Sequence, residues 1–141
     1  MSAMSDYLEW QLASHIFGSG TFTKPAVLGI ALCSGFPSDA MTGATIPEMA
    51  NAGAYARQTL NPSSVNWLDP IGADGTCYNN VQIDFPTATA NWGLVSGVAI
   101  VTSATYGAGQ MLVRGALTTP KVIDSGDALR IPVSGMAFTF A

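Results

Sequence analysis

Apolar residues recur at every fourth position near the start of the chain. Leu8, Leu12 and Ile16 follow this spacing, which is typical of one face of an amphipathic α-helix. Ser5 is a favourable N-cap residue, and acidic residues follow it at the positive end of the helix dipole. Gly18 is a common residue just past a helix end. The pattern predicts one short helix that is capped by Ser5 and ended by Gly18.

From Pro25 onward the pattern becomes that of β-strands. Residues 26–32 form a continuous apolar run of strand length, which is typical of a strand buried on both faces. Gly97 interrupts a later apolar run and predicts a bulge or a close approach of two backbones. Pro120 is expected to end the strand before it. The further predicted strands cover residues 55–60, 81–85, 94–101, 110–117, 122–123, 129–133 and 136–140.

Two segments lack periodicity and are rich in Gly, Pro, Ser, Thr and Asp. Residues 33–54 are predicted to form a long loop and residues 61–75 a second one. Long loops in compact domains usually have a function, and we expect the first to contact neighbouring subunits. The closely spaced strands predict a mainly β fold, an antiparallel β-sandwich or barrel with one short N-terminal α-helix. We expect one domain over residues 1–141, with a helical arm over 1–20 and the sandwich over 21–141.

The charge content changes this picture most. Only 10% of the residues are charged, against about 25% in ordinary soluble domains, while 48% are hydrophobic. A monomer of this composition exposes apolar patches, so we expect an obligate assembly. The net charge of −4 and the five basic residues argue against nucleic acid as a partner. We also expect no membrane association and no signal peptide, because every apolar run is interrupted and the N-terminus lacks a basic region.

The sequence gives little support for a metal site, a cofactor site or a nucleotide-binding site. His15 is the only histidine, and together with Cys33 and Cys77 it provides too few ligands for a zinc site. We expect both cysteines to behave as small buried hydrophobic residues. The segment 107–109 carries two glycines of a dinucleotide-binding fingerprint, but the third position is Leu112, which favours a hairpin turn. We therefore predict no catalytic residue, no metal and no cofactor.

Acidic residues leave two weaker alternatives open. Residues 69–75 hold two aspartates in a turn-rich stretch that suggests a calcium loop, but apolar residues occupy intervening ligand positions. Asp84, Asp124 and Asp127 could meet in space as a glycosidase pair, since two carboxylates suffice for that chemistry. Carboxylates in turns are usually solvated, which is the interpretation we favour.

A cluster of charges near the C-terminus raises the same question. Residues 124–127 have the composition of a tight turn, in which glycine takes a positive φ and aspartate binds its own backbone. We interpret the cluster as the solvated corner of a β-hairpin, with Lys121 and Asp127 close enough to pair across it. The cluster comprises Arg114, Lys121, Asp124, Asp127 and Arg130.

Several blocks of sequence resemble a known family. They are residues 5–9 (SDYLE), 22–26 (FTKPA), 54–57 (AYAR), 83–88 (IDFPTA), 91–93 (NWG), 115–121 (GALTTPK) and 125–127 (SGD). With these blocks the chain resembles a family of small tailed-bacteriophage virion proteins, often labelled tail fibre proteins and in some phages placed on the capsid as cement or decoration subunits. None of the blocks is a catalytic motif.

The resemblance implies a non-enzymatic structural protein of the virion that assembles in the host cytoplasm. We expect a capsid cement or decoration protein on the capsid surface, because one compact β unit leaves no room for a fibre shaft. Its partners would be the major capsid protein and copies of itself in a homotrimer. The alternative is a tail fibre or tail-associated receptor-binding component with a host surface receptor. The candidate contact residues are Tyr7, Leu8, Trp10, Leu12, Ile16, Phe36, Ile46, Met49 and Trp67.

Overall fold

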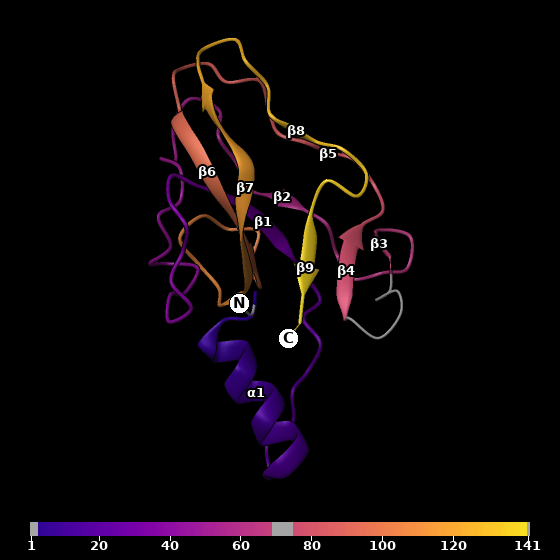
Figure 1. Ribbon diagram of the computed structural model, residues 1–141. Helices are drawn as coiled ribbons and strands as arrows, with labels where there is room; N and C mark the ends of the chain where they lie inside the picture. The colour runs from indigo at the N-terminus through magenta and orange to yellow at the C-terminus, as the bar shows by residue number, and fades with distance from the viewer. Residues whose placement is uncertain (1–2, 69–74, 141) are drawn as a thin grey trace.

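The computed structural model describes residues 3–68 and 75–140 and is mainly β (Figure 1). One helix precedes the strands, and three antiparallel sheets follow. The elements are α1 (Asp6–Phe17), β1 (Gly29–Cys33), β2 (Gln58–Thr59), β3 (Trp67–Leu68), β4 (Thr76–Asn79), β5 (Ile83–Asp84), β6 (Gly93–Val101), β7 (Met111–Ile123), β8 (Arg130–Ile131) and β9 (Ala137–Thr139).

The largest sheet has the strand order β2-β1-β6-β7 and is covered on both faces. Successive side chains of β1 point to opposite faces, so Ile30 and Leu32 enter the main core while Ala31 and Cys33 enter a second, smaller cluster. The long loop supplies Ile46 to that second cluster. The prediction that this apolar run forms a strand buried on both faces is confirmed.

The other two sheets are small, and they cover the main core on the side away from the large sheet. Their strand orders are β3-β4-β9 and β5-β8, and each contributes apolar side chains such as Phe138 and Ile131 to the main core. All pairings are antiparallel. The predicted mainly β, antiparallel fold is confirmed, and among the described residues the sheets form no closed barrel.

Gly97 has the role that its position predicts. The register between β6 and β7 shifts between Val95 and Gly97, which is the signature of a bulge. A Cβ atom at Gly97 would lie 2.6 Å from the carbonyl oxygen of Gly35, so the start of the long loop approaches the strand too closely for any side chain. Both parts of the prediction are confirmed.

Pro120 does not end a strand, contrary to the prediction. Strand β7 continues through it to Ile123 as one element. Val95 pairs with Lys121 and Gly97 pairs with Ala116, so residues 117–120 bulge out opposite a single residue of β6. A proline is tolerated there because a bulged residue donates no ladder hydrogen bond.

The charged corner is a turn but not a hairpin. The Asp127 N–H donates to the Asp124 carbonyl (3.0 Å), and Gly126 has a φ of +93°, as its sequence predicts. However, β8 pairs with β5 and not with β7, so the chain crosses to another sheet after the turn. The hairpin predicted around residues 107–109 is confirmed, since β6 and β7 are paired neighbours on either side of it.

The remaining boundaries differ in smaller ways. The predicted strand over 55–60 shortens to β2, and the second loop contains β3, which pairs with β4. Two-residue strands such as β3 leave too short an alternation to detect in sequence. The hypothetical calcium loop lies mostly in residues 69–74, outside the described residues.

The N-terminal helix follows its capping signals. The Ser5 side chain accepts a hydrogen bond from the Leu8 N–H, and the Gly18 N–H donates to the Ser14 carbonyl. Within α1 only Leu8 is buried. Figure 1 shows the helix extending away from the sheets at one end of the molecule. The predicted helix is confirmed, although Ile16, at the end of its stripe, is exposed.

Candidate functional site: an apolar groove beside the N-terminal helix

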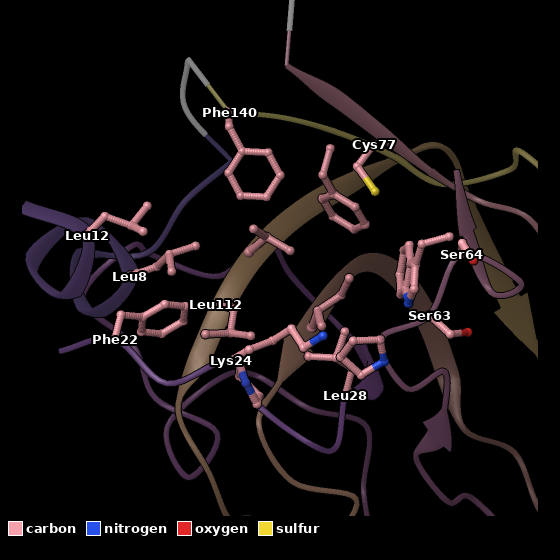
Figure 2. A pocket seen from close by; sticks show the side chains of 16 residues that line it. Leu8, Leu12, Phe22, Lys24, Leu28, Ser63, Ser64, Cys77, Leu112 and Phe140 are labelled. Carbon is pink, nitrogen blue, oxygen red and sulfur yellow. The ribbon is translucent and has the colours of Figure 1, made fainter. Parts of the chain in front are cut away.

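The described surface contains an open groove of about 510 Å³ between α1 and the small sheet β3-β4-β9 (Figure 2). Apolar side chains from segments distant in sequence converge on it. Its lining comprises Leu8, Leu12, Phe22, Lys24, Pro25, Leu28, Pro62, Ser63, Ser64, Trp67, Cys77, Ile100, Leu112, Val113, Phe138 and Phe140. A dry apolar cavity of about 150 Å³ already binds benzene, so this groove has room for about three groups of that size.

Each wall of the groove is fixed by the fold. Strands β6 and β7 supply the floor through Ile100, Leu112 and Val113. The helix side is anchored at its start, because the Ser5 hydroxyl donates to the Met111 carbonyl and the Ser5 N–H to the Leu112 carbonyl (2.9 Å). These bonds hold Leu8 and Leu12 against one side of the groove.

The opposite wall is held by a turn before β3. The Trp67 indole N–H donates to the Leu60 carbonyl (2.9 Å), so its one polar atom is satisfied and its ring is left to line the groove. The Ser63 carbonyl accepts from the Trp67 N–H (3.0 Å) and fixes the turn. In Figure 2, Ser63 and Ser64 lie across the groove from Leu8 and Leu12.

Charge in the groove comes from one residue. Lys24 is the only charged side chain in the lining, and it is exposed. Within the described part of the chain no carboxylate forms a salt bridge with it. The Cys77 thiol, also in the lining, donates to the Leu68 carbonyl (3.2 Å). The groove therefore combines a mainly apolar lining with one positive charge.

A polar centre lies beside the smaller apolar cluster and is almost fully buried. Arg57 binds Glu48 in a bidentate pair, with Nε to Oε1 at 2.8 Å and Nη2 to Oε2 at 2.7 Å. The Arg57 guanidinium also donates to the carbonyls of Gly43, Ser103 and Ala108. The Tyr55 hydroxyl donates to Glu48 (2.9 Å).

The pKa shifts of the residues beside Arg57 are typical of a structural site. Burial, followed by the charge of Glu48, raises the pKa of the Tyr55 hydroxyl well above its usual range. The same two causes raise the pKa of the Cys33 thiol to about 12, which leaves it protonated and unreactive. The pair ties the long loop to the 102–110 loop. Sequence analysis missed it, and the only signal was an isolated arginine after a loop that contains a glutamate.

The five charged residues near the C-terminus do not form one site. Arg114 lies over the Phe36 ring, 4.6 Å from its centroid, and contacts Asp39 at 3.5 Å. Arg130 pairs with Asp84 across β8 and β5 at 2.6 Å. Hydrogen bonds from Gln82 and then from Arg130 lower the pKa of Asp84.

The three carboxylates considered as a glycosidase pair are likewise divided. Asp84 is engaged with Arg130, whereas an Asp127 carboxylate oxygen accepts from the Asp124 N–H (3.1 Å) within the turn. The solvated-turn interpretation fits this arrangement. Among the described residues no group of three potential metal ligands comes together, and no described helix is long and apolar enough to cross a membrane.

The candidate contact residues fall into three groups. Those exposed are Trp10, Ile16 and Phe36, and those partly buried are Tyr7, Leu12 and Trp67. Leu8, Ile46 and Met49 are buried within the chain because they pack in its two apolar clusters, although Leu8 also belongs to the groove lining. Leu12 and Trp67 line the groove, where they meet residues that sequence analysis did not select, such as Phe22 and Phe138.

A model of the protein family described as podophage GP4 fiber I protein gp80 matches residues 3–139. The chain belongs to this family. The match confirms the resemblance to small tailed-phage virion proteins and identifies the chain as a phage virion structural protein. No curated protein matches the chain.

Proposed function

We propose that this fiber I family protein is a subunit of a virion fibre, held in place by burying apolar surface against other virion proteins. The observation that carries the proposal is the family match over residues 3–139. The groove supports it, because an open hollow lined mainly by apolar side chains is suited to receive an apolar segment of another protein. A receptor-binding role at the tail is compatible with such a fibre.

The described polar groups support a structural and non-enzymatic role. The enclosed Arg57 centre is saturated by hydrogen bonds, and two of the carboxylates considered for catalysis are already engaged, Asp84 by Arg130 and Asp127 by a backbone N–H of its turn. Catalysis of hydrolysis needs a positioned acid, base or nucleophile that faces a cleft. The groove offers apolar side chains and a single lysine instead.

A capsid cement protein is the second candidate, and one observation favours it. Some of the exposed apolar residues lie at opposite ends of the molecule. Trp10 and Phe17 lie on α1, while Leu94 and Val122 face each other across β6 and β7 at the far end (Figure 1). A protein that bridges neighbouring capsid subunits needs two such contacts. In that role it would bind the major capsid protein and stabilise the assembled shell by mass action.

Copy number separates the two candidates. Quantitative mass spectrometry of purified virions, with the major capsid protein as an internal standard, gives the copies per particle. A fibre predicts a few dozen copies or fewer, and gold-labelled antibodies should mark the tail or its attachment site. Hundreds of copies and label over the whole capsid would reject the fibre and support the cement protein.

A further inference from the structure

The groove and the outer face of α1 complement each other. Helix positions that are seven residues apart lie on one face, so Trp10 and Phe17 share the side opposite the anchored Leu8. Phe17 is 88% exposed and Trp10 is 65% exposed. The outer face of α1 therefore presents two large rings to solvent, while the groove beside the same helix has room for such rings.

Charge is complementary as well. Asp6 lies four residues before Trp10 on the same outer face, and it is exposed. The groove carries Lys24 and no acidic side chain. An occupant with two rings and one carboxylate would therefore satisfy both the apolar lining and the lysine.

Such an occupant cannot be the chain's own helix. Leu8 and Leu12 of α1 already form one side of the groove, so the outer face of the same helix must point away from it. A helix of 12 residues is also marginal in water without a packing partner, and the C-terminal half of α1 has no buried residue. A second molecule is needed to cover the helix and to fill the groove.

We propose that the groove binds the outer face of α1 from a second copy of this chain. Phe17 and Trp10 of one copy enter the groove between Leu28 and Trp67 of the other, and Asp6 approaches its Lys24. Repetition of this contact around a symmetry axis gives a closed oligomer. The contact involves only copies of this chain, so it goes beyond the proposed function and is testable on the purified protein wherever it lies in the virion.

Cross-linking between differently substituted chains tests the contact directly. In a Cys77→Ser background, one chain carries Ala13→Cys, an exposed position between Trp10 and Phe17 on the outer face of α1, and the other carries Ser64→Cys in the groove lining. Mild oxidation of the mixture should join the two chains through a disulfide, identified by mass spectrometry. Ser125→Cys, in the exposed turn after β7, is the matched control and should give little product. Equal yields from Ser64→Cys and Ser125→Cys would overturn the proposal.

Sedimentation velocity provides the second measurement. The wild-type protein should self-associate at micromolar concentration, and Phe17→Ser should raise the dissociation constant about tenfold or more. Val133→Ser removes an apolar side chain that is also exposed but lies outside the groove and α1, and it should have no effect. A monomeric wild-type protein, or equal losses in both variants, would contradict the proposal.

The pairing of Lys24 with Asp6 can be tested with two matched substitutions, since the chain contains two lysines. Lys24→Glu should weaken association about two- to fivefold, whereas Lys121→Glu changes the net charge equally and should not. The loss should shrink as salt is added, because the groove mouth is open to solvent. Equal effects of the two substitutions would show that only net charge matters and would reject the pairing with Asp6.

Discussion

The two faces of the large sheet differ in how they are covered. On one face the long loop closes over β1 and β6, and its Glu48 is paired with Arg57, with both side chains almost fully buried. On the other face the floor of the groove remains open beside α1. The buried ion pair therefore links parts of the same chain, whereas the apolar groove is left for contact with another molecule.

The largest effect should come from breaking the sealed face. Arg57→Ala leaves Glu48 buried without its partner, which typically costs about 3–5 kcal/mol of the free energy of unfolding. Urea denaturation followed by circular dichroism measures the loss. Arg130→Ala removes an arginine from an exposed pair and should leave the midpoint near that of the wild type. Similar losses in both variants would show that the sealed face has no special role.

A smaller effect should follow from forcing the loop away from the sheet. Gly97→Ala places a methyl group against the Gly35 carbonyl and should cost about 1–3 kcal/mol of unfolding free energy. Gly115→Ala on the adjacent strand is the matched control, because its added Cβ meets its neighbours at ordinary distances of 3.4 Å or more. The same urea measurement applies, and a neutral Gly97→Ala would mean that the loop is not held close in solution.

The sealed face should also respond to alkaline pH. Because the pKa of Cys33 rises from 9.0 to about 12 on folding, the unfolded chain loses its thiol proton first. Stability from this group is complete below pH 9 and is lost as the pH rises toward 12. In the wild type, this thiol should lower the free energy of unfolding by about 1 kcal/mol between about pH 8 and pH 10. The Cys33→Ala variant should lack this part of the decline. Parallel pH profiles for wild type and variant would contradict this.

The smallest effect on folding should come from the open face. Phe17→Ser removes a side chain with little contact in the monomer, so unfolding free energy at high dilution should change by less than about 0.5 kcal/mol. Leu8→Ala, on the buried side of the same helix, should cost about 2–5 kcal/mol. Thermal melts at low protein concentration distinguish the two. A large loss of unfolding free energy in Phe17→Ser would mean that the Phe17 side chain packs within its own chain.

Sequence analysis succeeded where the determining interactions are local. Ser5 and Gly18 bound the helix through contacts three or four residues away, and Gly97 marks a bulge because no side chain fits there. Residues 124–127 form their predicted turn for the same reason.

It failed where the partner is distant in sequence. Pro120 lies inside β7 because the register with β6 shifts at that point, which no local pattern reveals. The path after the turn depends on β8 choosing β5 as its partner. The groove is assembled from separated segments, so only Leu8, Leu12 and Trp67 of its lining were selected as contact residues. Arg57 finds partners up to 51 positions away, and its role was invisible for that reason.

The turn that follows α1 has a consequence for the rate of assembly. The Phe22 N–H donates to His15 Nδ1 (3.3 Å), and Gly20 packs on Ser14 so closely that a Cβ atom would overlap its side chain. The chain reverses direction tightly here. The backbone that carries Phe17 is therefore held in place, although the Phe17 side chain is almost fully exposed. Little backbone entropy then remains to be lost when a partner arrives. Copies of the protein would associate at a rate set by encounter and orientation, without waiting for a flexible arm to fold.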